Sequence, residues 1–422
     1  KAYVYDTALG KLKDVSPQNS SFATTLGLRS AGSIGDTVFL AGPGLSGGVN
    51  FFAFSSSASA YIASCTASQF NNIRQWRVIN NALYAGVGNT AGGGGLVRWN
   101  GTPSQPFDST ASATCGFEVV ANLPGDAAYI TAYGPASDRI AVSTWPNPLG
   151  APGATAGVYL SPQMPAAGFT SSDANTPWTP LWLPSLYEPD PVTALTDIGG
   201  GIAYWNGALY FGTMHVPGLS ALAHTSAYPN DTESSLTVFA NTYRAISVWR
   251  IQNADTIPSV QLLYGESALP KFDPGTNTFQ STSTGYSPLY GSSGFGNVFN
   301  NYTWSAAVFQ DRLFFGTMDW SYLAYEGLLG AAPQQQNPQG QNQGDSQSFF
   351  GADLWRFDSG SRPAVAENAN GLGNYLNYGL RTMITSADGQ NLFVGTANPM
   401  NLEAKGGWEL RRLKLRNPQN SQ

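Results

Sequence analysis

The sequence has little charge. Only 11% of its 422 residues are charged, against 42% hydrophobic and 13% aromatic residues. Its 26 acidic and 20 basic residues give a net charge of -6, and Lys and Arg form no cluster. Because nucleic-acid binding needs a basic face, this composition excludes a polynucleotide partner. The uncharged surface that remains, rich in Ser, Thr, Asn, Gln and Gly, is typical of an extracellular protein.

Long apolar runs are also missing. No stretch approaches the roughly 18 to 20 residues that a membrane-spanning helix needs, so we expect no transmembrane segment. The sequence begins at Lys1 without Met, and we interpret this start as the result of removing an export signal. The expected location is therefore extracellular, at the cell surface or in the periplasm.

Cysteine and histidine are scarce, with two residues of each. An even pair in an exported chain favours a disulfide between Cys65 and Cys115 over a metal site or a nucleophile. A copper, zinc or haem centre is not expected from so few His and Cys residues, and we predict no cofactor. Calcium remains possible through backbone carbonyls and scattered carboxylates, for which the candidates are Glu188, Asp190 and Asp197.

Two common catalytic motifs are absent as well. The run from Gly92 to Gly95 lacks the Lys-Ser/Thr pair of a nucleotide-binding loop. No nucleophile elbow accompanies either histidine, so we expect no serine triad.

What the sequence does have is a short repeat. Six segments share a turn-bounded and mostly aromatic strand pattern, whose fullest form is Leu-Tyr/Phe-x-Gly-Thr. The six segments are Val38–Gly42, Leu83–Val87, Ile140–Thr144, Leu209–Thr213, Leu313–Thr317 and Leu392–Thr396. A turn containing Asn, Asp or Gly precedes each of them and predicts a tight hairpin. A loop and a third strand follow, at Val49–Phe52, Leu96–Trp99, Val158–Leu160, Ser247–Arg250, Asp353–Arg356 and Trp408–Arg411.

These units predict an all-β fold, a single β-propeller domain of about six four-stranded blades that spans residues 1–422. Five or seven blades remain possible, because residues 266–301 could hold an extra hairpin. The last unit ends after its third strand, so we expect the N-terminal segment, with strands at Ala2–Asp6 and Lys11–Val15, to complete it and close the ring. Residues 333–348 are a Gln/Asn-rich tract that we expect to be a mobile surface loop.

The repeat resembles those of bacterial secreted β-propellers. The shared features are the polar turn, the Leu-Tyr/Phe-x-Gly-Thr strand and the x-Leu/Val-Trp-Arg strand, and residues 2–11 are similar to a blade of the quinoprotein-like (PQQ-type) propellers. The resemblance covers nearly the whole chain and implies an architecture only. Propellers include enzymes, ligand-binding proteins and scaffolds, so the resemblance implies no particular activity.

Polar and aromatic residues follow several of the repeated strands. In a propeller these positions surround one mouth of the central channel, which makes them candidate ligand contacts. Asp319 and His215 are candidate catalytic groups, and the other candidates are Asn89, Trp320 and Asn398. Each has a plain structural alternative, since Asp319 could cap a turn and His215 could be an ordinary loop histidine.

Three arginines stand near the expected starts of the innermost strands. Counting back about nine residues from the repeated strands gives Arg29, Arg74 and Trp304, and a slightly longer hairpin gives Arg381. Arginines around a channel would suit an anionic ligand. The structural alternative is that they bridge neighbouring blades through carbonyl groups or an aspartate such as Asp353.

Two hypotheses about function follow. The first is a binding or scaffolding module for a protein, glycan or filament at the cell surface. The alternative is an extracellular hydrolase of a small anion, polythionate-like or a sugar acid, with Arg29, Arg74 and Arg381 holding the charge and Asp319 as general acid or base. Whether the protein is an enzyme is left open by the sequence.

Overall fold

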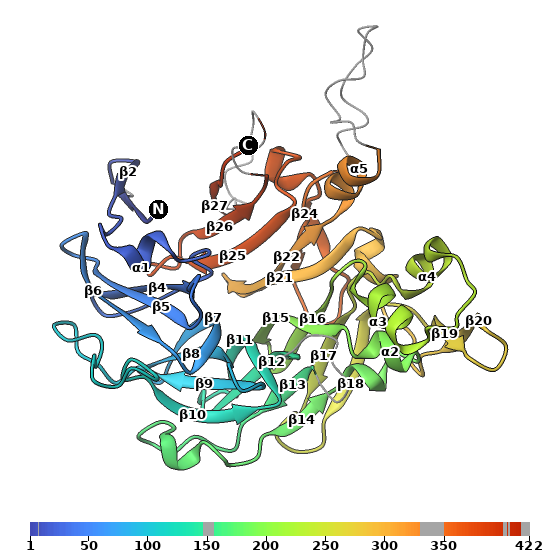
Figure 1. Ribbon diagram of the computed structural model, residues 1–422, viewed down its shortest axis with the longest axis horizontal. Helices are drawn as coiled ribbons and strands as arrows, with labels where there is room; N and C mark the ends of the chain where they lie inside the picture. The colour runs from blue at the N-terminus through green and yellow to red at the C-terminus, as the bar shows by residue number, and fades with distance from the viewer. Residues whose placement is uncertain (7, 147–155, 330–349, 400–402, 404–405, 415–422) are drawn as a thin grey trace, which may run out of the picture. The chain divides into compact units, whose positions relative to one another are not determined.

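Antiparallel four-stranded sheets dominate the computed structural model, which describes residues 1–6, 8–146, 156–329, 350–399, 403 and 406–414 (Figure 1). The chain divides into two compact units, residues 1–181 and 182–422. The predicted tract at 333–348 lies outside the described residues. None of the described helices is long and apolar enough to span a membrane.

The first unit contains three four-stranded sheets, coloured blue to green in Figure 1. The strands of the first are β3 (Ser30–Ile34), β4 (Thr37–Pro43), β5 (Val49–Ser55) and β6 (Ala60–Ala67). The second comprises β7 (Phe70–Ile79), β8 (Ala82–Asn89), β9 (Gly94–Arg98) and β10 (Glu118–Leu123), and the third β11 (Gly125–Tyr133), β12 (Arg139–Pro146), β13 (Gly157–Leu160) and β14 (Thr179–Trp182). Outside them lie β1 (Tyr3–Asp6) paired with β2 (Lys11–Asp14), α1 (Ser20–Ala23) and the 3-10 turn Ser171–Asp173.

The second unit repeats this strand order. One sheet runs through β15 (Asp197–Trp205), β16 (Ala208–His215), β17 (Val248–Gln252) and β18 (Ser259–Tyr264), and the next through β21 (Asn300–Phe309), β22 (Arg312–Asp319), β23 (Leu354–Phe357) and β24 (Val365–Asn368). The last has β25 (Gly379–Thr385), β26 (Leu392–Ala397) and β27 (Leu410–Leu413). Bridges at Met214–Tyr302 and Met318–Gly379 connect these sheets.

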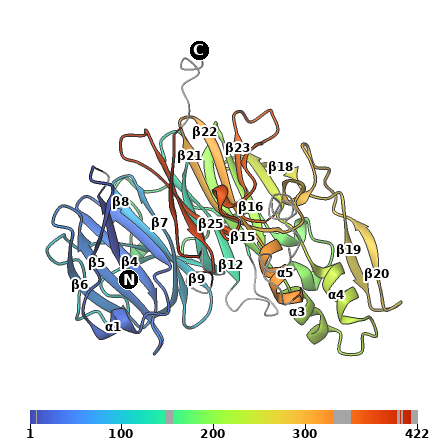
Figure 2. The ribbon, with the colours of Figure 1, turned by 90° about the horizontal axis from the view of Figure 1, so that it is seen from above.

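Helices and one further hairpin are additions to the sheets of the second unit. The helices are α2 (Pro191–Ala194), α3 (Leu219–Ala227), α4 (Ser235–Thr242) and α5 (Ser321–Leu329), with 3-10 turns at Pro184–Leu186, Ser293–Gly296 and Gly371–Gly373. The hairpin is β19 (Ala268–Asp273) with β20 (Thr278–Ser283), in the segment where the sequence left room for one. Figure 2 shows α3 and α4 beside this hairpin.

The repeated segments form the strands that the sequence predicts. All six are the second strands of their sheets, namely β4, β8, β12, β16, β22 and β26. The predicted third strands are present, although β27 begins at Leu410 and not at Trp408. This mostly-β structure of four-stranded antiparallel sheets is consistent with a β-propeller. The all-β prediction did not anticipate α3 and α4.

The expected starts of the first strands need correction. β7 begins at Phe70 and β21 at Asn300, so Arg74 and Trp304 lie inside these strands and not at their starts. Both strands are lengthened by register shifts, at Ile73/Trp76 and at Thr303/Ser305. A β-bulge adds residues to one strand only, which counting along a regular hairpin does not allow for. Arg29 directly precedes β3, and Arg381 lies within β25.

The Gly and Thr of the repeat have separate structural roles. A Cβ atom at Gly212 would collide with the side chain of Thr303 on β21, so glycine lets adjacent sheets approach. The threonine that follows accepts a hydrogen bond from the backbone N–H that enters the third strand. This bond joins Ser247 N to Thr213 Oγ1 (2.9 Å), Asp353 N to Thr317 Oγ1 (2.8 Å) and Glu409 N to Thr396 Oγ1 (3.0 Å).

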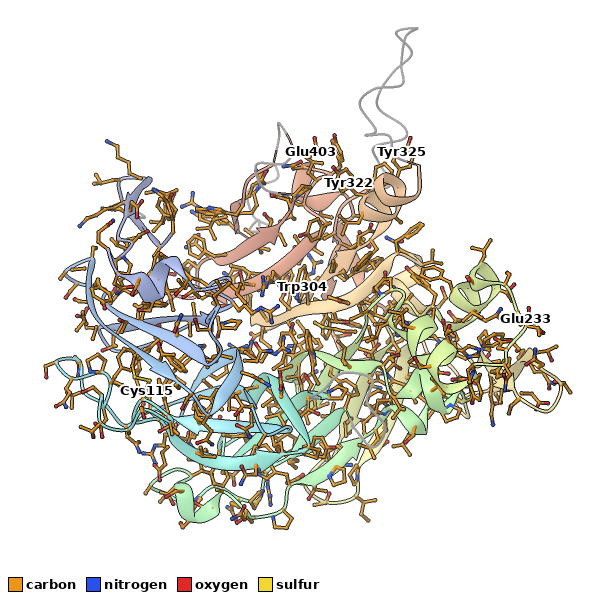
Figure 3. The ribbon with its side chains drawn as sticks, viewed as in Figure 1. Cys115, Glu233, Trp304, Tyr322, Tyr325 and Glu403 are labelled. Atoms are coloured by element: carbon orange, nitrogen blue, oxygen red, sulfur yellow. A yellow bond between two sulfur atoms is a disulfide. The ribbon has the colours of Figure 1, made fainter. Side chains whose placement is uncertain are left out.

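The predicted disulfide joins Cys65 of β6 to Cys115 in the loop before β10, with 5.9 Å between the two Cα atoms (Figure 3). It lies against an aromatic core of the first unit, in which Phe39 and Trp76 stack with ring centroids 5.3 Å apart. The bond therefore ties the first sheet to the second over a buried apolar cluster.

Candidate functional site

A cavity of about 210 Å³ lies within the second unit. Its walls come from the segment after the 3-10 turn at 184–186, the start of β15, the end of α4, the loop before β17 and the start of β19. The titratable residues that line it are Tyr187, Glu188, Asp197, Tyr243, Arg244 and Glu266. Ala240 on α4 and Val298 are exposed lining residues, so they mark the solvent side of the cavity.

A buried ion pair forms one wall. Arg244 Nε donates to Glu188 Oε2 (2.6 Å), and Nη2 donates to Oε1 (3.1 Å), in a two-pronged contact. The remaining guanidinium donors bond to backbone carbonyls, with Nη1 donating to Asn241 O (2.8 Å) and Tyr243 O (3.0 Å) and Nη2 to Pro270 O (3.0 Å). An arginine has five N–H groups, so every donor of Arg244 is engaged.

Burial perturbs the groups around this pair. It raises the pKa of Glu188 to about 7, since the loss of hydration outweighs the attraction of Arg244 and since Asp197 adds repulsion. Burial likewise raises the pKa of Tyr243 to about 12. The ion pair therefore holds the wall in place, while burial and Asp197 disfavour the charged form of Glu188.

Asp197 connects the cavity to a chain of buried polar groups. His215 Nδ1 lies 3.3 Å from Asp197 Oδ1, and His215 Nε2 lies 3.1 Å from Ser220 Oγ at the start of α3. The His215 and Ser220 side chains are 1% exposed. The order Ser-His-Asp is that of a catalytic triad, which the sequence did not predict.

The burial of this chain argues against a nucleophile. The Thr196 hydroxyl lies 2.7 Å from Thr193 O and in short contact with Ser220 Oγ, so Ser220 stands between Thr196 and His215. A triad serine has to reach the bound substrate, and Ser220 is 1% exposed and does not line the cavity. The network fixes Asp197 at the cavity wall.

Asp319 lies at the end of β22 and is not among the residues that line the cavity, although its charge raises the pKa of Tyr243, which does line it. It is fully buried, and its carboxylate accepts from Ser321 N (2.7 Å) and Asn297 Nδ2 (2.7 Å). Burial raises its pKa, partly offset by these hydrogen bonds. The contact with Ser321 is the turn-capping geometry that the sequence offered as an alternative.

Two predicted arginines belong to the first unit. Arg74 Nη2 donates to Asp126 Oδ2 (3.0 Å), and the guanidinium lies over the Trp145 ring at 3.7 Å from its centroid. Asp126 is on β11, so Arg74 connects the second sheet to the third. Arg29 is exposed, and its Nη1 is 3.4 Å from Asn72 Oδ1.

The other predicted contacts are dispersed. In the second unit, Arg381 lies 5.4 Å from the ring centroid of Trp304 (Figure 3). Asn398 Nδ2 donates to Asn377 Oδ1 (3.0 Å), and the Trp320 backbone N–H donates to Phe299 O (2.9 Å). In the first unit, the carbonyl of Asn89 accepts from Asn71 Nδ2 (3.0 Å). None of the predicted catalytic and ligand-contact residues lines the cavity, although His215 contacts Asp197 in its wall. Of the calcium candidates, Glu188 and Asp197 do line it.

The carboxylates considered for calcium have other partners. Glu188 binds Arg244, and Asp190 caps α2 by accepting from Val192 N (3.1 Å) and Thr193 N (2.8 Å). Within the described ranges, no group of three His, Cys, Asp or Glu residues is placed to hold a metal ion. Calcium through backbone carbonyls stays a prediction.

Sequence reasoning missed Arg244, Tyr243 and Glu266. All three lie in connecting segments, where the repeat offers no alignment. The one available signal was length, because the connection from β16 to β17 is among the longest in the chain, and long ordered loops often carry function.

Many solved structures are similar to the chain, including the following three. A variant of AofleA from Arthrobotrys oligospora is 8% identical with a TM-score of 0.40, covering 93% of this chain and 89% of that one. A protein described as a 6-phosphogluconolactonase from Bacteroides fragilis is 8% identical at 0.41, covering 98% and 90%. An endo-arabinanase from Bacillus licheniformis is 11% identical at 0.30, covering 70% and 89%.

These similarities are too low to say anything about ligand or activity. No protein-family model and no curated protein sequence matches the chain.

Proposed function

We propose that the protein is an exported β-propeller that works as a binding module and receives its ligand, or a side chain of its partner, in the cavity of the second unit. The propeller would have about six blades, with β1 and β2 completing the last one. Export is supported by the disulfide, since such bonds persist mainly in oxidising compartments.

The observation that carries this proposal is a cavity whose walls are already fixed. Binding sites are usually preformed hollows with a few placed polar groups. Here the Glu188–Arg244 pair and the His215 contact hold the polar wall, and the exposed residues Ala240 and Val298 stand beside the opening.

Binding is favoured over hydrolysis of a small anion for two reasons. Arg244, the guanidinium at the cavity, has no donor left for an anion. Ser220, the serine beside His215, is 1% exposed and does not line the cavity. Asp319 does not line this cavity, so an anion hydrolase that used Asp319 would need a different substrate site.

The test is a ligand screen by thermal shift with a variant that covers the opening. Sugars, carboxylates and amines are titrated against wild type and Ala240→Trp. We expect at least one compound to raise the wild-type Tm in a saturable way and to lose this effect in Ala240→Trp.

The matched control is Ala227→Trp, which adds the same side chain at an exposed position of α3 that does not line the cavity. It should respond like wild type. A screen without any saturable shift, or an equal shift in Ala240→Trp, would contradict the proposal.

A further inference from the structure

We propose that the group bound in this cavity is a primary ammonium, such as an alkylamine or a lysine side chain. This inference rests on the proposed function and specifies the chemical class of its ligand. Among the described residues, most side-chain hydrogen-bond donors of the cavity wall already have partners, whereas two of its acceptors do not.

Most of the side-chain donors of the wall are used. The guanidinium of Arg244 has all five N–H groups engaged. Ser293 donates its hydroxyl to Glu266 Oε1 (2.7 Å), and Tyr243 donates to Val298 O (2.9 Å) or to Asn301 Oδ1 (2.8 Å). Tyr187 accepts from the Glu266 backbone N–H (2.7 Å), so among the described residues its hydroxyl proton is left for a bound group. An anion would therefore find a phenol but no cationic donor there.

The acceptors of the wall are available. Asp197 uses only Oδ1, with His215, and Glu266 uses only Oε1, with the backbone and hydroxyl of Ser293. Among the described residues, Asp197 Oδ2 and Glu266 Oε2 have no hydrogen-bond partner. These two carboxylate oxygens can therefore accept hydrogen bonds from a bound group.

The charge of the wall points the same way. The lining residues Glu188, Asp197 and Glu266 are three carboxyl groups beside one guanidinium, that of Arg244. A bound cation would offset this excess of acidic groups. Tyr187 and Tyr243 also line the cavity, and aromatic rings attract a cation that lies over their faces. Burial, with a smaller contribution from the repulsion of Asp197, raises the pKa of Glu188 to about 7, so a cation beside it would favour its charged form.

A sugar fits this wall less well. Hydroxyl groups accept as well as donate, and their acceptor lone pairs would face a wall with few free donors. An ammonium has three donors and no acceptor, and with a short alkyl chain it is small enough for a volume equivalent to roughly seven water molecules.

The test compares three probes of similar size by titration calorimetry at neutral pH: n-butylammonium, 1-butanol and butyrate, with glucose as a fourth. We expect saturable binding of butylammonium alone. Asp197→Asn and Glu266→Gln should each raise its Kd at least tenfold, whereas Glu233→Gln, between α3 and α4 (Figure 3), should leave it unchanged.

Proton release gives a second readout. A cation beside Glu188 favours its carboxylate, so binding near pH 7 should release a proton, seen as a dependence of the heat on buffer ionisation. Glu266→Gln keeps the test valid if Asp197→Asn disturbs His215 and folds poorly.

The outcomes separate the two proposals. If glucose or butyrate binds, butylammonium does not, and Ala240→Trp abolishes the binding, the cavity is a ligand site and the ammonium inference is wrong. Butylammonium binding that is equal in wild type, Asp197→Asn and Glu266→Gln also overturns it. If no probe or screened compound binds, both proposals fail.

Discussion

Gly212 shows how a single residue of the repeat lets two sheets pack. Its missing side chain leaves room for Thr303 on β21. We expect Gly212→Ala to lower the free energy of unfolding by roughly 1–3 kcal/mol, because overpacking displaces the neighbouring strand. Urea unfolding followed by tryptophan fluorescence measures the change.

The control is Gly27→Ala, where an added Cβ meets nothing within 4 Å. We expect its stability to stay within about 0.5 kcal/mol of wild type. Equal effects of the two substitutions would show that Gly212 is not needed for sheet packing.

Thr317 makes the second residue-scale contribution of the repeat. Its hydroxyl accepts from Asp353 N at 2.8 Å and donates to Asn300 Oδ1 at 2.8 Å, with all groups buried. Thr317→Val keeps the shape and leaves the N–H of Asp353 without this acceptor, so we expect a loss of about 1–3 kcal/mol in urea unfolding. Thr278→Val, at an exposed position of β20, should change little.

At the scale of elements, the second strands could be predicted because each has its own turn signal and an aromatic, β-branched run. β4, β8, β16, β22 and β26 all fall on such runs, and even the degenerate copy forms β12. Strand starts were harder, since the bulges in β7 and β21 depend on contacts across the sheet and not on local sequence.

The candidate site could not be predicted in the same way. Glu188, Arg244 and Glu266 are 22 to 78 residues apart in sequence, in three different connections that share no repeat. Only tertiary packing brings them to one cavity. Asp197 and His215 were both singled out, but for calcium and for catalysis, because a sequence does not show that they are partners.

The disulfide is an element-scale restraint, since Cys65 and Cys115 are 50 residues apart and the bond joins β6 of the first sheet to the loop that leads into β10 of the second. Closing such a loop should stabilise the protein by about 2–4 kcal/mol. We expect a Cys65→Ala/Cys115→Ala double variant to have a free energy of unfolding lower by this amount, which shows as a lower urea midpoint. Adding a reductant should then lower the urea midpoint of wild type and leave that of the variant unchanged. An unchanged midpoint in the double variant would contradict this role.

At the scale of the whole molecule, the low charge content changes what the buried carboxylates do. Glu188 has one buried cation beside it, and Asp353 has only neutral donors, chiefly Asn300 Nδ2 at 2.6 Å. Burial raises the pKa of Asp353 to about 6, and Asp319 adds repulsion. With so few basic residues to compensate them, both acids are more easily protonated in the folded protein than in the unfolded chain.

This shift predicts that stability falls as the pH rises from about 5 to 8. An acid whose pKa is raised by folding stabilises the protein fully below its unfolded pKa, and that stability is lost as the pH passes the folded pKa. The windows are 3.8 to about 6 for Asp353 and 4.5 to about 7 for Glu188. Exposed acids whose pKa is lowered by folding, such as Asp36 and Asp108, change the free energy of unfolding only at pH values below this range.

The measurement is urea unfolding at several pH values for wild type and Asp353→Asn. We expect wild type to lose on the order of a few kcal/mol between pH 5 and pH 8. In Asp353→Asn the loss due to Asp353, which ends near pH 6, should disappear, so the loss that remains is smaller and continues up to the pKa of Glu188 near 7. A wild-type stability that is flat or rises over this range would mean that neither carboxyl group is held against its charge by the fold.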